Sequence, residues 1–248
     1  PINGDNDNGG WIKTKPVQSV SVAKERIKGT TKTSAINLIS KLSDKDEIEA
    51  LSGLTSSSDY NNAIVKCLGG YLAISESLTL QNVTLDGGAV WSKTASEIEA
   101  NNGLLTTLTN SGKTSATSLV EVNSTSTFEN VIIQNFASTT VAAINLLEGS
   151  NPSVNRSILV MDNCTVQLVK CPTGPVNLEP NTTLEATSST FTSNYANGTD
   201  GSGGAIYVSS DADATFENCV FKVSETTFFW TIFLFFEDIW IFYELKIF

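Results

Sequence analysis

The chain has 248 residues, 40% of them apolar and 17% charged, with a formal net charge of −11 and no histidine. The absence of histidine excludes Ser–His–Asp and Cys–His catalytic arrangements and any metal site built on histidine ligands. Between residues 67 and 224, five Lys/Arg residues stand against fourteen Asp/Glu residues, so no nucleic-acid partner is expected. The abundance of Ser, Thr, Asn and Gly favours an all-β or solenoidal chain over a helical bundle.

Residues 1–66 are predicted to form a mixed helical cap region. The segment 34–53 has helical spacing of its apolar residues, with Ser43 as the expected N-cap and Gly53 as the expected stop. We expect one or two helices here, with or without a strand, because an uncovered solenoid end would expose its apolar cross-section.

Two short motifs in this region do not predict a site. The carboxylates of "DNDNGG" (residues 5–10) alternate as in a calcium loop, yet Pro16 stands where that loop needs its bidentate glutamate. The triplet "RIK" (26–28) resembles a substrate-binding triplet of polygalacturonases, but it precedes the repeats and lacks that family's paired aspartates. We interpret the first as a polar terminus and the second as part of the cap.

Five units of alternating apolar residues follow, each centred on an asparagine or a serine. They are "SLTLQNVTL" (77–85), "TSTFENVII" (125–133), "ILVMDNCTV" (158–166), "NTTLEATSSTF" (181–191) and "DATFENCVF" (213–221). Their central residues are 48, 33, 25 and 30 residues apart. The first step, which includes residues 86–118, holds either a long loop or one unrecognised coil.

A second short strand precedes each unit. These strands are "YLAI" (71–74), "SLVEV" (118–122), "AAINL" (142–146), "PVNL" (175–178) and "GGAIYV" (203–208). Two or three short strands per coil, joined by loops of unequal length, are typical of a solenoid in which each coil covers the apolar face of the next. The sequence therefore predicts an all-β fold, a right-handed single-stranded parallel β-helix, over residues 67–224.

The central residue of each unit lies where the apolar alternation changes phase. Leu78 and Leu80 are expected inside, while Val83 and Leu85 are one step out of phase with them, so the chain must bend at Asn82. Asparagine tolerates the left-handed backbone conformation and hydrogen-bonds locally. We therefore predict a structural ladder of side chains that bond to one another from coil to coil, formed by Asn82, Asn130, Asn163, Ser188 and Asn218.

The segment 191–221, "FTSNYANGTDGSGGAIYVSSDADATFENCVF", contains an FxxN motif followed by GGAI. The motif residues are Phe191, Asn194, Gly203, Gly204, Ala205 and Ile206. This segment closely resembles the repeat of chlamydial polymorphic membrane proteins and of similar β-helical surface proteins in microbial eukaryotes. Looser copies such as "LGGYLAI" (68–74) extend the resemblance over roughly residues 67–224. The resemblance implies a passenger β-helix of the pectin lyase-like fold with a role in surface adhesion.

The remaining candidate sites fail on their residue types. "SGKTS" (111–115) has the Gly-Lys-Thr of a phosphate loop, but Thr107 replaces its first glycine, which favours an ordinary loop. Loop carboxylates in the clearest repeat, Asp200, Asp211 and Asp213, are interpreted as solvated charges rather than calcium ligands. Two of the four cysteines, Cys164 and Cys219, fall two coils apart in one interior column, which favours packing over a mutual disulfide. No catalytic residue, cofactor or metal site is predicted.

Residues 225–248 form an apolar C-terminal tail whose composition changes abruptly to Phe, Ile and Trp. Its first apolar run is interrupted by Glu237 and Asp238, which makes it too short and too charged for a membrane-spanning helix. Three interpretations stay open: a strand pair on the last coil, a membrane or interface anchor, and a sequence foreign to the natural protein.

The sequence as a whole predicts a non-catalytic adhesion or binding module, secreted or at the cell surface, with a glycan or protein ligand. Membrane association is expected only if the C-terminal tail is native. The alternative is a polysaccharide lyase or glycoside hydrolase of the pectin lyase-like β-helix type that uses Asp/Glu residues on one solenoid face. A structural spacer without a ligand is the third possibility.

Overall fold

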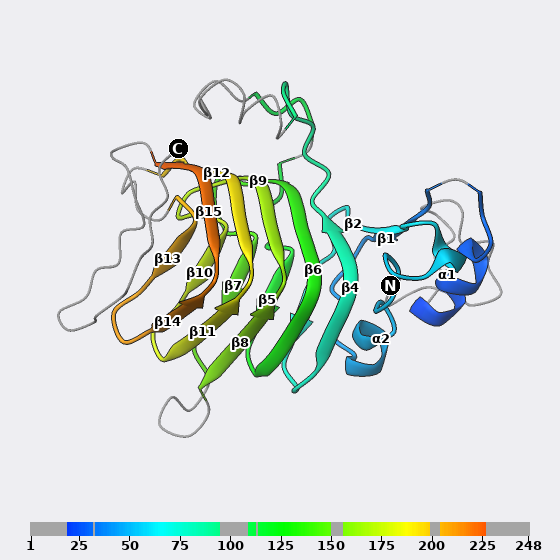
Figure 1. The fold of residues 1–248 in the computed structure, drawn as a ribbon, viewed down its shortest axis with the longest axis horizontal. Helices are drawn as coiled ribbons and strands as arrows, with labels where there is room; N and C mark the ends of the chain where they lie inside the picture. The colour runs from blue at the N-terminus through cyan, green and yellow to red at the C-terminus, as the bar shows by residue number, and fades with distance from the viewer. Residues whose placement is uncertain are drawn as a thin grey trace.

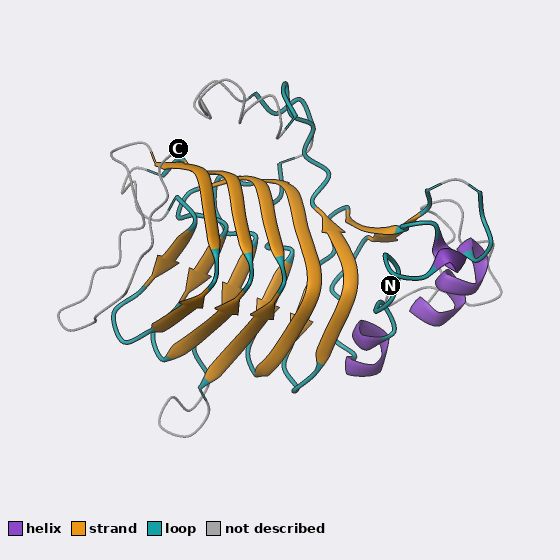
Figure 2. Cartoon of the chain, viewed as in Figure 1, coloured by secondary structure: helices purple, strands orange, loops and turns teal. Residues whose placement is uncertain are grey.

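The computed structural model describes residues 19–31, 33–94, 109–112, 114–149, 156–198 and 204–226. These residues form an elongated stack of strands with helices at its N-terminal end (Figures 1 and 2). Every pairing between named strands is parallel. The fold is an all-β parallel β-helix, as the repeats predicted.

The stack contains two sheets, which we call the short-strand sheet and the long-strand sheet. The short-strand sheet consists of β3 (Leu72–Ile74), β5 (Val120–Val122), β7 (Ile144–Leu146), β10 (Val176–Leu178) and β13 (Ile206–Val208). The long-strand sheet consists of β1 (Ala35–Leu38), β2 (Ile64–Cys67), β4 (Thr79–Asp86), β6 (Thr125–Ala137), β8 (Ser157–Asp162), β9 (Thr165–Cys171), β11 (Thr182–Thr187), β12 (Thr190–Ala196), β14 (Asp213–Glu217) and β15 (Val220–Thr226). In both sheets, strands that occupy the same position in successive repeat units are direct neighbours.

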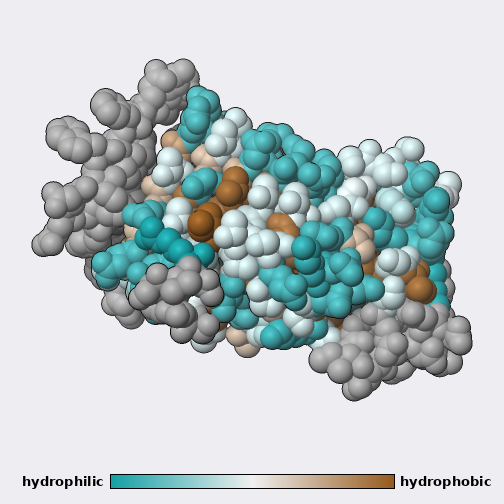
Figure 3. Space-filling view, turned by 90° about the horizontal axis from the view of Figure 1, so that it is seen from below, coloured by the Kyte–Doolittle hydropathy of each residue, from teal (hydrophilic) through white to brown (hydrophobic). Residues whose placement is uncertain are grey.

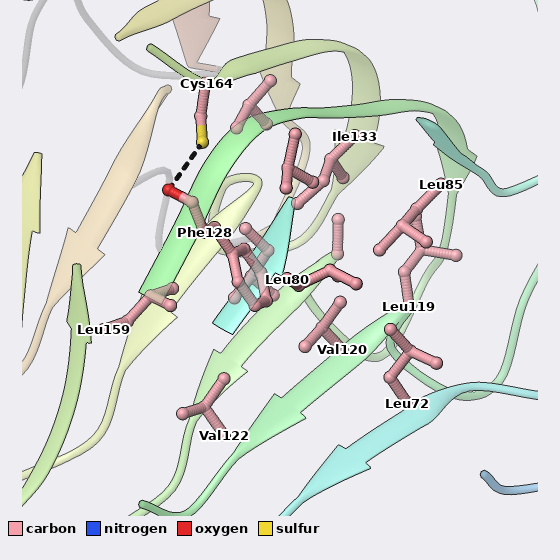
Figure 4. Packing of buried hydrophobic residues seen from close by; sticks show 14 of the residues in the cluster. Leu72, Leu80, Leu85, Leu119, Val120, Val122, Phe128, Ile133, Leu159 and Cys164 are labelled. Atoms are coloured by element: carbon pink, nitrogen blue, oxygen red, sulfur yellow. Dashed lines mark hydrogen bonds between the residues drawn. The ribbon is translucent and has the colours of Figure 1, made fainter. Parts of the chain in front are cut away.

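The core lies between the two sheets and is built from columns of apolar side chains in register. Leu85 pairs with Ile133, Ile133 with Val166, and Val166 with Phe191, and all four are fully buried. A facing column on the short-strand sheet begins with Leu72 and Val120 (Figure 4). Each buried side chain packs on the equivalent side chain of the adjacent coil. The alternation of apolar and polar residues along a strand therefore determines which face of that strand points into the core.

The step of 48 residues between the first two units does not place an extra coil between β4 and β6. Strand β4 pairs directly with β6, from Thr79 opposite Thr127 to Asp86 opposite Gln134. Within this step, Trp91 and Asn110 form an isolated antiparallel bridge.

The N-terminal region combines α1 (Val20–Ile27), β1, α2 (Lys45–Glu49), the 3-10 helix η1 (Ser58–Tyr60) and β2. Helix α2 is capped by Asp44, whose side chain accepts from Glu47 N at 3.0 Å, so the prediction of Ser43 as the cap is wrong by one residue. The helix ends at Glu49, before the expected stop. The parallel pairing extends through β2 to β1, so coil-like stacking already begins within residues 1–66.

Candidate functional site

The first bend of each coil lies in the long-strand sheet, at the position where the sequence places its asparagine or serine. The backbone there is left-handed, with φ between 50° and 54° in all five coils. The bend residues are Asn82, Asn130, Asn163, Ser188 and Asn218. Among the described residues, the ladder of side-chain bonds is partial, because one bond between bend residues is present: Asn163 Nδ2 donates to Asn130 Oδ1 at 2.6 Å.

A second column of polar side chains runs beside these residues on the outer surface. It contains the residues immediately before each bend: Gln81, Glu129, Asp162, Thr187 and Glu217. We call the ten residues of the two columns the bend stripe. Gln81 Nε2 donates to Glu129 Oε2 at 2.6 Å, while Asp162 and Glu217 are exposed. Since neighbouring strands lie about 4.8 Å apart, the bend stripe presents polar groups at a regular spacing along the solenoid.

The inner side of the first bend carries a repeated hydrogen bond between coils. The residue after the bend donates from its thiol or hydroxyl to a backbone carbonyl of the preceding coil. These bonds join Cys164 Sγ to Phe128 O at 3.4 Å, Ser189 Oγ to Met161 O at 3.4 Å and Cys219 Sγ to Ala186 O at 3.3 Å; Figure 4 shows the first. In the other two coils Val83 and Val131 occupy this position, so the column holds compact buried side chains and gains the hydrogen bond only in the three coils with a thiol or hydroxyl.

Three of the five coils also contain a second bend five residues after the first, which the sequence did not predict. Asn135, Leu168 and Ser193 are aligned there and have φ between 53° and 55°. In one coil a buried amide supports this bend: Asn194 Nδ2 donates to Val166 O at 2.9 Å, and Asn194 Oδ1 accepts from Val169 N at 3.3 Å. Asn194 thus holds the two sides of the bend at Leu168 in the preceding coil.

The FxxN motif therefore has a structural explanation. Phe191 is fully buried and stacks on Phe221, with ring centroids 5.0 Å apart and planes at 8°. Asn194 is also fully buried and makes the two bonds across the second bend. From the GGAI motif, Gly204, Ala205 and Ile206 are buried in the last described coil, and Ile206 pairs with Val176. Gly203 lies outside the described residues.

A buried carboxylate begins a further polar row on the long-strand sheet. Asp86 is 6% exposed, and it accepts from Gly88 N at 2.8 Å, Asn135 Nδ2 at 2.8 Å and Gln134 Nε2 at 3.1 Å. Gln167 Nε2 then donates to Gln134 Oε1 at 3.0 Å. Because these bonds satisfy the buried carboxylate, we interpret this row as structural.

The four cysteines are free; Cys67, Cys164 and Cys171 are buried, and Cys219 is half-buried. Burial raises the pKa of the Cys67, Cys164 and Cys171 thiols to about 12, with the Asp86 carboxylate adding to the effect at Cys67. Cys164 and Cys219 are aligned with Ser189 between them, so they lie two coils apart as predicted. At neutral pH these thiols are protonated and poor nucleophiles.

The carboxylates considered for calcium are not brought together in a cluster. Asp213 forms an ion pair with Arg156 at 2.6 Å, and the backbone carbonyl of Asp211 accepts from the same arginine at 3.2 Å. Asp200 and residues 5–10 lie outside the described residues. Over the part of the chain that the structure describes, no group of three or more Cys, Asp or Glu side chains is placed to hold a metal ion.

The two motifs that resembled substrate or phosphate sites lie in ordinary structural positions. Arg26 and Ile27 end α1, with Ile27 buried, and Lys28 is the C-cap residue. Ser111 N donates to Val90 O at 2.9 Å, which places the start of "SGKTS" in the loop that also contains the Trp91 bridge. Lys113 is outside the described residues.

The chain matches no protein-family model, and comparisons with curated proteins and with solved structures found no match. The resemblance to polymorphic membrane protein repeats therefore remains an interpretation of the residues from Phe191 to Phe221. No helix in the described ranges has the length and apolar character needed to cross a bilayer.

Proposed function

We propose that this protein is a non-catalytic binding module, secreted or at the cell surface, which contacts a glycan or a protein ligand through the bend stripe. The observation that carries this proposal is the repetition of exposed polar side chains at one position of successive coils. Asn130, Asp162, Asn163, Ser188, Glu217 and Asn218 are all exposed. Amides and carboxylates together provide both donors and acceptors.

The rigidity of the coils supports a binding role. The core residues directly behind the bend stripe, such as Val83, Val131 and Cys164, are 0% to 1% exposed. Side chains fixed on a closely packed sheet lose less conformational freedom on binding than side chains on mobile loops. A ligand that spans several coils would meet an ordered row of groups.

Burial raises the pKa of Cys164 to about 12, which argues against this thiol as a catalytic nucleophile. One feature suits the alternative of a lyase or hydrolase. Glu129 and Asp162 are direct neighbours on adjacent strands, and glycoside hydrolysis uses two carboxylates. The binding module is the better-supported proposal because the stripe extends well beyond this pair.

The test is a binding screen of the purified chain against oligosaccharides and extracellular matrix proteins. The double variant Asp162→Ala/Glu217→Ala should weaken binding at least about tenfold, whereas Asn177→Ala on the short-strand sheet should not change it. Shortening of an oligosaccharide, abolished by Glu129→Gln or Asp162→Asn, would favour the enzyme instead. No binding to any probe would favour a structural spacer.

A further inference from the structure

The outer face of the long-strand sheet has an aliphatic centre formed by β8. Ile158 and Val160 alternate with the buried Leu159 and therefore point outward, and both are half-buried. Their neighbours on β6 are Thr125 and Thr127, and their neighbours on β11 are Thr183 and Glu185. We call this surface, together with Asp162 and Glu217, the outer β8 face.

The charges around this aliphatic centre are predominantly negative. Glu129 and Asp162 lie directly opposite each other on β6 and β8, an arrangement of like charges that destabilises a sheet. Arg156 and Asp213 form an ion pair at the edge of this surface. Among the described residues, Asp162, Glu185 and Glu217 form no ion pair. All three of these carboxylates are exposed.

We infer that the outer β8 face binds a cationic, extended protein segment. Lysine and arginine side chains have an aliphatic part and a charged end. Their aliphatic parts can pack on Ile158 and Val160. Their charged ends can then pair with the carboxylates of Asp162, Glu185 and Glu217. Such a partner relieves the repulsion between Glu129 and Asp162 that the free sheet retains. The net charge of −11 favours the approach of the same kind of partner. This inference rests on the proposed binding function and specifies its ligand.

The experiment uses the full chain and two synthetic peptides, one of alternating lysine and threonine and one with glutamate in place of lysine. Binding is measured by calorimetry at low and high salt. We expect the lysine peptide to bind and the glutamate peptide not to bind. The affinity for the lysine peptide should fall roughly tenfold at the higher salt concentration, because the contacts are between exposed charges.

Two variants with equal change in net charge separate a local site from a general charge effect. The site variant is Asp162→Asn/Glu185→Gln/Glu217→Gln. The control variant is Glu25→Gln/Asp46→Asn/Glu76→Gln, which changes exposed carboxylates near the N-terminal end of the stack. The site variant should weaken binding of the lysine peptide at least about tenfold, with the control variant within about twofold of the unmodified protein.

Equal losses in the two variants would overturn the inference, as would equal binding of both peptides or binding of neither. If a neutral oligosaccharide bound the bend stripe with no dependence on salt while the lysine peptide did not bind, the proposed function would stand and the cationic partner would be wrong. Circular dichroism of both variants establishes that each retains the fold.

Discussion

In three coils, two bends use the same left-handed backbone, but the two are supported from opposite sides of the sheet. At the first bend, Asn130 and Asn163 are exposed and bond to each other on the outer surface. At the second bend, the support at Leu168 comes from inside, where Asn194 is fully buried. The exposed bend is therefore supported by the side chain of the bend residue itself, whereas the interior bend at Leu168 is supported by a residue of the neighbouring coil.

The largest loss of stability is expected at the interior bend, which Asn194 supports. Asn194→Leu leaves Val166 O and Val169 N without their side-chain partner in a buried site, so the free energy of unfolding should fall by about 3 kcal/mol. Urea denaturation followed by circular dichroism measures this loss. A loss no larger than that of an exposed bend variant would show that the interior amide is not the main support.

The exposed bend should give a smaller effect. Asn130→Leu removes the acceptor of the Asn163 amide and places a branched side chain in a left-handed conformation, so we expect a loss of about 2 kcal/mol. Thr127→Leu, which alters an outward residue of the same strand in extended backbone, serves as the control. An unchanged thermal midpoint for Asn130→Leu would contradict the structural role of the first bend.

A gain in stability, rather than a loss, is expected when Leu168 is replaced by asparagine. Leucine is unfavourable at φ 55°, and asparagine tolerates that conformation better, so Leu168→Asn should raise the free energy of unfolding by about 1 kcal/mol. The measurement is again urea denaturation, with Thr165→Asn as the control at an outward position of the same strand. A destabilised Leu168→Asn variant would mean that contacts of the leucine side chain outweigh its backbone strain.

The smallest effect near neutral pH is expected for Cys164→Ser. Ser189 makes the equivalent hydrogen bond one coil later, so the change should stay within about 1 kcal/mol. Burial raises the pKa of Cys164 to about 12, above the value of roughly 8.5 in an unfolded chain. The unfolded state therefore loses its proton first, and stability falls as the pH rises from about 9 toward 12 by about 1 kcal/mol per pH unit for this thiol.

Unfolding measured between pH 8 and 11 checks the contribution of this thiol. The serine variant lacks the Cys164 thiol and should therefore lose less stability over that range than the unmodified protein. It should still lose some stability, because Cys67 and Cys171 contribute the same trend. Identical pH profiles for the two proteins would show that Cys164 is accessible to water in the folded state.

The first bend was predictable because one residue type marks it in four of the five coils. The second bend was not, since Asn135, Leu168 and Ser193 share no side-chain chemistry. One signal was present: Ile133 and Phe136 are both fully buried, although an unbroken strand would place residues three apart on opposite faces. A second change of phase in the apolar pattern thus indicated a second bend.

The surface was harder to predict than the core. Apolar alternation identified the short-strand sheet and the buried columns, because register follows from which face is apolar. The pairing of Glu129 with Asp162 follows from the alignment of the units, because each residue directly precedes a central asparagine, but the exposure of the two side chains does not follow from that alignment. The buried Asp86 and its three donors were missed because two of them, Gln134 and Asn135, come from the next coil.

The parallel pairing also makes the molecule a one-dimensional series of interfaces. Each coil contacts the coil before it and the coil after it, so unfolding can start at a free end and proceed coil by coil. Among the described strands, β13, β14 and β15 each pair with one neighbour, whereas β6 pairs on both sides. Amide hydrogens of β6 should therefore exchange with solvent far more slowly than those of β15, and protection should decrease in steps along the stack toward its C-terminal end.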